Sequence, residues 1–365
     1  MRSDLSFQWN AARLERAFQG VQTAVQTRPP ATAAVLAVAD DRQVIRCEAY
    51  SKNDMPTPAS VDSIFLLASI TKPIIALAIM QMMEDGLLAL HQPIHHYLPD
   101  FEPSIKMPIT IWNLLTHTSG MSEIEWSTAL AQRPYHAVSY EVARKADLNF
   151  IPGTRFQYST LSFYVLAELI ARLSGLSYTM VLQKRIFEPL GMHDTSFDPR
   201  PKADRLVKVE GITADLPVSV EEATDHLIAL KMPGAGLWST ASDLAKFGQA
   251  LLNIAHRQDT EKPQLLSFSH LDLMTREHTA GINKLENDHF QAVHYGLAWR
   301  KGILDGHETL PGSPSVFEHD GATGGMLWID PEWNLIVVFL TNAFGADATV
   351  RYNALQVVYS ALSRY

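Results

Sequence analysis

The chain has 365 residues, and 39 acidic against 30 basic side chains give it a formal net charge of −9 at pH 7. This excess of negative charge argues against nucleic acid or an anionic membrane surface as the main partner, because both attract positively charged proteins. Hydrophobic residues make up 47% and charged residues 19% of the chain, a composition typical of a globular protein that buries its own core.

The first part of the chain predicts a helix followed by two strands. Apolar residues recur at helical spacing from residue 14 to 25. Residues Ala33–Ala39 and Gln43–Ala49 are typical of two strands joined by a turn at Asp40-Asp41. The only cysteine, Cys47, lies in the second of these strands, where we expect a half-buried structural side chain rather than a reactive thiol.

The middle of the chain, from about residue 90 to 250, is mainly helical, with proline and glycine between the helices. A long apolar helix precedes it at Lys72–Leu88, and its clearest helices are Ile111–Leu115, Leu161–Ser174, Thr179–Ile186 and Ala241–Leu252. The stretch from about 255 to 290 is polar and only weakly periodic, so we predict irregular structure there.

The last part of the chain predicts strands and a final helix near 350–362. Four segments rich in β-branched and aromatic residues are separated by turns: Tyr295–Arg300, Ser315–His319, Met326–Asp330 and Leu335–Thr341. We therefore predict an α/β (α+β) fold, in which an antiparallel sheet built from both chain ends is flanked by helices. Residues 1–75 and 235–365 are expected to form the sheet domain, and residues 76–234 a mainly helical domain inserted into it.

Ser69-Ile70-Thr71-Lys72 is the only Ser-x-x-Lys sequence in the chain, and it opens the most apolar helix. At this spacing the Ser69 hydroxyl and the Lys72 amine lie on one face of a helix, within reach of each other. The apolar neighbours are expected to bury Lys72 and to push its amine toward the neutral form, which accepts a proton. The pattern is that of a nucleophile with its base, although a capping serine beside a solvated lysine gives the same four letters.

Two further segments can complete such a site. Tyr158 stands just before the predicted helix Leu161–Ser174, where its phenol can project into a cleft and, next to a lysine ammonium, act as a proton shuttle. His319-Asp320-Gly321 begins a glycine-rich segment between two predicted strands, whose backbone N–H groups can serve an oxyanion hole. Each segment also has an ordinary structural interpretation, as a tyrosine packed at a helix entry and as a hairpin turn.

In this order the three segments resemble the serine β-lactamase and penicillin-binding-protein superfamily, for which Ser-x-x-Lys is a signature. The likeness is greatest to the class C-like branch, which includes the family VIII carboxylesterases and D-stereospecific peptidases, and it runs from about residue 33 to 345. Three flanking phrases belong to it as well, namely Leu114–Gly120, Pro189–Met192 and Gly236–Leu244.

The resemblance implies a catalytic role for each matched residue. Ser69 is the acylated nucleophile, Lys72 the lysine of the first motif, and Tyr158 the tyrosine that acts as base and then as acid. The backbone N–H groups of Ser69 and Ala322 form the oxyanion hole, and neither a metal nor a cofactor is implied. The residues themselves leave open whether Lys72 or Tyr158 takes the serine proton, since the two groups titrate as a coupled pair.

The substrate-binding positions depart from the family pattern. Thr160 replaces the usual asparagine, which helps to hold the acylamide of lactam substrates. His319 and Asp320, followed by Gly321, stand where lysine and a hydroxyl residue grip the substrate carboxylate in β-lactamases. A neutral histidine is a poor clamp for an anion, and Asp320 repels a carboxylate if it faces the cleft or pairs with a neighbour if it does not. Both changes favour neutral acyl substrates such as esters.

We therefore predict a serine hydrolase that forms an acyl-enzyme on Ser69 and hydrolyses short-to-medium acyl esters. The expected partner is a small acyl substrate, not nucleic acid or a membrane, and the oligomeric state stays open. A β-lactamase or D-amino-peptide hydrolase, and an acyltransferase on the same scaffold, are the alternatives, and a non-catalytic ligand sensor is a third class of function. Because residues 1–10 lack the apolar segment of a secretory signal, we expect a cytoplasmic protein. Residues 120–150 and 255–290 are the candidates for a lid over the cleft.

Overall fold

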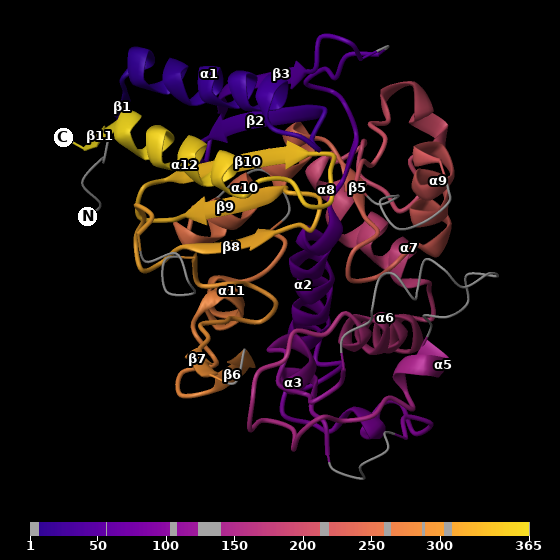
Figure 1. Cartoon of the computed structure of the whole chain (residues 1–365). Helices are drawn as coiled ribbons and strands as arrows, with labels where there is room; N and C mark the ends of the chain where they lie inside the picture. The colour runs from indigo at the N-terminus through magenta and orange to yellow at the C-terminus, as the bar shows by residue number, and fades with distance from the viewer. Residues whose placement is uncertain are drawn as a thin grey trace.

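The computed structural model describes residues 7–55, 57–102, 108–122, 140–211, 219–258, 264–286, 289–302 and 309–364. Its centre is a five-stranded antiparallel sheet in the order β3-β2-β10-β9-β8 (Figure 1). The early strands are β2 (Ala33–Ala39) and β3 (Val44–Ser51), and the late ones are β8 (Phe317–Asp320), β9 (Met326–Asp330) and β10 (Leu335–Thr341). Strand β10 pairs with β2, so the two ends of the chain meet inside one sheet. The predicted fold class is confirmed.

Strand β2 has an unbroken apolar sequence because both faces of the sheet are covered. Val35 and Ala37 belong to the core that the sheet shares with α10 (Ala241–Ala255). Leu36 and Val38 point to the other face, into a separate core beneath α1 (Ala11–Thr27) and α12 (Thr349–Ala361). Figure 1 shows these two terminal helices side by side over the sheet.

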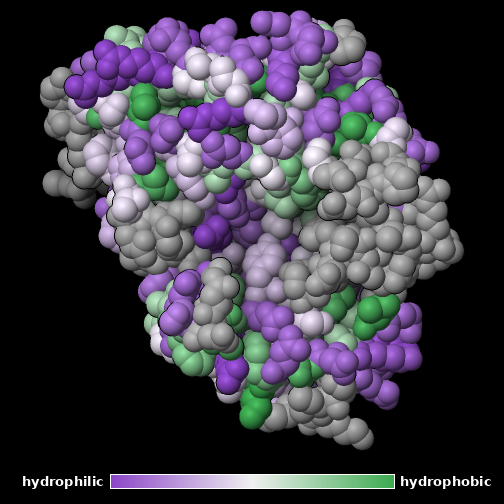
Figure 2. Space-filling model, viewed as in Figure 1, coloured by the Kyte–Doolittle hydropathy of each residue, from purple (hydrophilic) through white to green (hydrophobic). Residues whose placement is uncertain are grey.

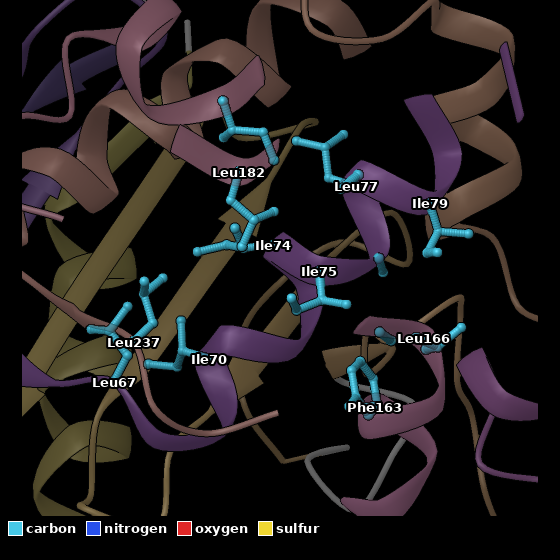
Figure 3. Close-up of a cluster of buried hydrophobic side chains, with 14 of the residues drawn as sticks. Leu67, Ile70, Ile74, Ile75, Leu77, Ile79, Phe163, Leu166, Leu182 and Leu237 are labelled. Carbon is cyan, nitrogen blue, oxygen red and sulfur yellow. The ribbon is translucent and has the colours of Figure 1, made fainter. Parts of the chain in front are cut away.

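Helix α2 (Thr71–Glu84) runs through the larger core and is apolar around most of its circumference. Figure 3 shows Ile74 and Leu77 pointing toward Leu182, whereas Ile75 lies on the side of Phe163. These partners come from α7 (Tyr178–Leu182) and α6 (Leu161–Ser174), which pack against α2. A helix that is apolar all round is stable only when other elements enclose it, so α2 is a fixed support for whatever its first turn carries.

Shorter elements complete the described part of the chain. Three two-stranded ladders join β1 (Phe7–Trp9) to β11 (Leu362–Arg364), β4 (Phe65–Leu66) to β5 (Trp238–Ser239), and β6 (Asn283–Glu286) to β7 (His289–Ala292). The other helices are α3 (Ile111–Leu115), α5 (Tyr140–Ala143), α8 (Glu188–Leu190), α9 (Val220–Leu230) and α11 (Phe268–Thr275). Four short helical turns are η1 (Ala68–Ile70), η2 (Ile94–His96), η3 (Gln183–Phe187) and η4 (Arg200–Arg205).

Two predictions about secondary structure are wrong. The segment Tyr295–Arg300 is not a strand but a tight turn, in which the N–H of Gly296 bonds to Trp299 and Ala298 has a φ of +60°. Its apolar residues are buried by packing between other elements, which a strand-like composition does not distinguish from a sheet. The stretch 255–290 is not irregular throughout, since it contains α11 and the first strand of the β6–β7 hairpin.

The division into residues 1–75 with 235–365 and residues 76–234 stays a prediction. Within the described residues, no single helix combines the length and apolar character that crossing a membrane requires, and only the bent pair Leu161–Ser174 with Tyr178–Leu190 meets that criterion when its two parts are counted together.

Candidate active site

Ser69 sits in the short turn η1, directly before α2. From Ser63 to Met82 every residue is buried except Ser69, which is half-buried and lines a cavity of about 720 Å³. The turn is fixed by the Thr71 hydroxyl, which donates to the carbonyl of Ala68 at 2.7 Å and accepts the N–H of Leu237 at 3.2 Å. The fold therefore presents one hydroxyl to the cavity from an otherwise closed segment.

Lys72 lies directly behind this serine and has no exposed surface. Its Nζ donates to the Ser69 Oγ at 3.1 Å and to the carbonyl oxygen of Gly234 at 2.8 Å. The same nitrogen is 4.6 Å from the centroid of the Tyr158 ring and 5.4 Å from that of Phe163. The predicted burial of Lys72 is confirmed, and its amine is aimed at the serine hydroxyl.

Tyr158 lines the cavity and is held by His117. The N–H of Gln157 donates to the His117 carbonyl at 2.9 Å, and the N–H of Ser159 donates to the His117 Nδ1 at 3.0 Å. The His117 ring also stacks on the Tyr158 ring, with 4.4 Å between centroids. The backbone on both sides of Tyr158 and its ring are thus fixed by a single residue.

Two residues of this cluster are not among the predicted site residues. His117 lies inside the Leu114–Gly120 phrase, but no local pattern connects it with Tyr158, which is 41 positions away. Gly234 accepts the hydrogen bond from Lys72, and a Cβ on it would lie 3.2 Å from the side chains of Phe163 and Thr160. The two glycines of Pro233-Gly234-Ala235-Gly236 are the signal for this close approach of backbone.

Thr160 and His319 lie close to the cavity without lining it. Thr160 is buried, and its methyl group faces Gly234. The His319 Nδ1 donates to the carbonyl oxygen of Asp320 at 2.7 Å, which leaves Nε2 as an acceptor, without a hydrogen-bond partner among the described residues. Burial lowers the pKa of His319 to about 4, and the charge of Lys72 acts in the same direction against that of Asp320. His319 is therefore neutral at pH 7, as predicted for a poor anion clamp.

The end of β8 approaches the serine turn more closely than a side chain allows. A Cβ on Gly321 would lie 2.4 Å from the carbonyl oxygen of Leu67, so only glycine fits there. The Thr323 hydroxyl donates to the Leu66 carbonyl at 3.0 Å and ties the same two segments together. Ala322, between these two residues, lines the cavity with Ser69. The segments expected to supply the oxyanion hole are side by side.

The cavity is lined on another side by the β6–β7 hairpin. Lys284 and Leu285 of β6 line it, and the N–H of Phe156 donates to the Asn283 carbonyl at 3.0 Å. The hairpin belongs to the 255–290 lid candidate, whereas most of the other candidate, residues 123–139, lies outside the described residues. Figure 2 shows the hollow near the centre of this face, where hydrophilic side chains predominate.

This geometry suits acyl transfer. A hydroxyl hydrogen-bonded to a buried amine can lose its proton to that amine, and the ring of Tyr158 lies beside the same amine. Ala322, a small residue, follows the strand edge next to the serine turn. Of the predicted residues, Ser69, Tyr158, Asp320, Gly321 and Ala322 line the cavity, while Lys72, Thr160 and His319 stand behind its wall. Their roles in a reaction stay predictions.

Known proteins are similar to this chain over most of its length. The chain matches the family described as Beta-lactamase over residues 17–360. Esterase EstB of Burkholderia gladioli is 27% identical over 374 residues, which cover 91% of this chain and 90% of EstB. The D-alanyl-D-alanine-carboxypeptidase/endopeptidase AmpH of Escherichia coli (strain K12) is 29% identical over 235 residues, 61% of this chain and 58% of AmpH. The crystal structure of a family VIII carboxylesterase shares the fold, with a TM-score of 0.77 at 17% identity over 98% of this chain and 100% of that one.

Proposed function

The chain belongs to the Beta-lactamase family and is a serine hydrolase, and from that premise we propose that it is a carboxylesterase acting on neutral esters through an acyl-enzyme on Ser69. The similarity to EstB extends over nine tenths of both chains and supports an ester as the substrate. The neutral His319, which stands where β-lactamases have a lysine, supports an uncharged substrate.

The single observation that carries this proposal is the contact between Lys72 and Ser69. Their side chains are 3.1 Å apart, and Lys72 is wholly buried, so the amine has no solvent to bind in place of the hydroxyl. Burial disfavours the charged form of an amine, and a neutral amine accepts a proton.

The reaction then has two halves with the same groups in reversed roles. In the first, Ser69 Oγ attacks the ester carbonyl carbon, its proton passes to Lys72 or Tyr158, and the alcohol leaves with a proton from that pair. In the second, water attacks the acyl carbon, the pair takes a proton from the water, and Ser69 recovers one as the acid is released. The N–H groups of Ser69 and Ala322 stabilise the oxyanion in both halves.

Hydrolysis of p-nitrophenyl butyrate by the wild type and by Ser69→Ala tests the proposal. We expect the variant to lose at least 10³-fold in kcat, as expected for loss of a covalent nucleophile (about 10³ or more), and to keep the thermal unfolding midpoint of the wild type. Equal rates for the two proteins would reject Ser69 as the nucleophile.

A second candidate function is hydrolysis of D-amino peptides. It is favoured by the 29% identity to AmpH, which covers 61% of this chain. Its substrates end in a carboxylate, which neither His319 nor Asp320 is suited to hold. A D-alanyl-D-alanine peptide and a chromogenic cephalosporin, assayed beside p-nitrophenyl butyrate, distinguish the two functions. Faster turnover of the peptide or the cephalosporin would favour the second.

A further inference from the structure

The wall of the cavity contains a carboxylate held between two guanidinium groups. Asp320 Oδ2 accepts a hydrogen bond from Arg351 Nη2 at 2.7 Å and lies 3.3 Å from Arg300 Nη1. All three residues line the cavity, and the side chains are 27% exposed for Asp320, 20% for Arg300 and 8% for Arg351. The carboxylate is therefore the most exposed charge of this group.

Each arginine also contacts a group other than Asp320. Arg351 donates to the carbonyl of Gly324 at 3.3 Å and to the Tyr352 hydroxyl at 3.2 Å. Arg300 Nε lies 3.5 Å from the buried carboxylate of Glu318. Two arginines thus face two carboxylates, and their four charges add up to zero. Of these four charged side chains, Asp320 is the most exposed and lines the cavity.

A substrate carboxylate would compete with Asp320 for the same two arginines. The two cations form the kind of site that binds a carboxylate through charge-assisted hydrogen bonds. Because the protein's own carboxylate is already there, an anionic substrate gains no free cation at this wall and meets a like charge in a partly buried setting, where repulsion is weakly screened. Lys284, the other cation in the lining, belongs to the β6–β7 hairpin and not to this group.

We propose that Asp320 is a specificity-determining residue, which excludes carboxylate-bearing substrates by occupying a carboxylate site formed by Arg300 and Arg351. The inference rests on the proposed ester hydrolysis at Ser69 and extends it to the choice of substrate. It also explains why Asp320 both lines the cavity and pairs with the two arginines. Removal of this one negative charge opens the site.

Two pairs of esters test the proposal by placing a carboxylate on either side of the ester bond. Methyl 4-acetoxybenzoate is compared with 4-acetoxybenzoate, and p-nitrophenyl hexanoate with mono-p-nitrophenyl adipate. The readout is the ratio of kcat/KM for the neutral ester to that for the anionic ester. When this ratio is compared between protein variants, the intrinsic reactivity of each ester cancels. For the wild type we expect a ratio of at least ten in one pair or both.

Asp320→Asn keeps the shape of the side chain and should lower that ratio at least fivefold. Arg351→Met removes a cation and leaves Asp320 less compensated, so it should raise the ratio. The matched control is Asp100→Asn, which removes one negative charge from an ion pair with Arg172 outside the cavity and should leave the ratio unchanged. Thermal unfolding shows whether each variant has folded. If one of the two cavity variants does not fold, the change in the kcat/KM ratio of the other is sufficient to test the proposal.

The proposal is overturned if the wild type hydrolyses anionic and neutral esters equally well, or if the ratio does not move in Asp320→Asn and Arg351→Met. To separate this result from a failure of the proposed esterase function, the same ratio is measured for modification of Ser69 by an alkyl fluorophosphonate and its ω-carboxyalkyl counterpart, which needs no turnover. Absence of any modification by either probe would reject the nucleophile, and with it both proposals.

Discussion

The imidazole ring of His117 stacks on the phenol ring of Tyr158, with 4.4 Å between their centroids and 22° between their planes. Burial holds the pKa of His117 well below its ordinary value, so the ring stays neutral. Since its Nδ1 accepts the N–H of Ser159, the ring is fixed in one tautomer and one orientation. Tyr158 therefore has little freedom beside Lys72.

His117→Phe keeps a stacked ring but removes the acceptor for the buried N–H of Ser159. Leaving that donor unpaired costs about 1–3 kcal/mol of stability, and a small displacement of Tyr158 is expected to lower kcat by about 10-fold or more. We expect KM to change much less. His117→Asn, which carries an acceptor near the Nδ1 position, should retain more of the activity. Steady-state kinetics and thermal unfolding check this, and a kcat of His117→Phe equal to the wild type would contradict it.

Lys72→Met replaces a buried amine by an apolar side chain of similar length. Activity should fall by about 10²–10⁴-fold, the range for loss of a general base. Stability should stay equal or rise, because removing the Lys72 amine from water opposes folding.

Lys246→Met is the matched control for this substitution. Lys246 bonds to the buried Asp243 at 2.7 Å, so we expect this variant to lose stability and to keep activity. Ester hydrolysis and urea unfolding of both variants give the comparison. Loss of stability in Lys72→Met without loss of activity would overturn the assignment of the base.

Gly321→Ala tests the close approach between the end of β8 and the serine turn. The added Cβ would lie 2.4 Å from the Leu67 carbonyl oxygen, so one of the two segments must move. We expect this movement to misalign the N–H groups of Ser69 and Ala322, the predicted oxyanion donors. Loss of one oxyanion donor lowers kcat by about 10²–10³-fold, and we expect a loss of that order. Gly20→Ala, in the exposed face of α1, has no atom within 4 Å of the new Cβ and should leave activity unchanged while adding up to about 1 kcal/mol of stability.

Stability should fall between pH 6.5 and pH 4 because of His319. Its pKa is about 4 in the folded protein, mainly through burial, and about 6.5 in the unfolded chain. The unfolded chain binds the proton first as the pH falls, so the contribution to stability is complete above pH 6.5 and declines by up to about 1.4 kcal/mol per pH unit toward pH 4. Buried His117 acts in the same direction.

Urea unfolding of the wild type and His319→Gln at pH 7 and pH 5 measures this contribution. The variant should lose less stability than the wild type over that interval. Asp41 and Asp194 do not obscure it, because hydrogen bonds from His256 and Arg205 lower their pKa values to about 2, and their contribution is lost only below about pH 4. Equal slopes for the two proteins would show that His319 does not titrate in this range.

Sequence patterns predicted the elements that have a regular or a continuous apolar pattern. The predicted bounds of β2, β9, β10 and α6 agree with those of the structure, since each has an apolar face or a continuous apolar sequence with clear ends. The β6–β7 hairpin was not predicted, because its large apolar side chains Leu285 and Phe290 are exposed and give no pattern typical of a buried strand. Its position comes from the contact of Asn283 with Phe156, far away in the sequence.

For the site, the local spacing of Ser69 and Lys72 predicted their contact, since one helical turn suffices to bring the two side chains together. The stacking of His117 on Tyr158 and the pairing of Asp320 with two arginines depend on how distant segments pack. The sequence contains no period or spacing from which either contact follows. For Asp320, both alternatives stated from the sequence hold at once, because it lines the cavity and pairs with neighbours.

The central claim, a covalent intermediate on Ser69, is tested most directly by trapping that intermediate. The wild type is mixed with p-nitrophenyl butyrate, quenched in acid during turnover, and examined by intact-mass analysis and peptide mapping, with Ser69→Ala treated in the same way. We predict a mass increase of one butyryl group on the peptide that contains Ser69, and none in the variant. Continued hydrolysis by Ser69→Ala, or an acyl group on a different residue of the wild type, would contradict the account.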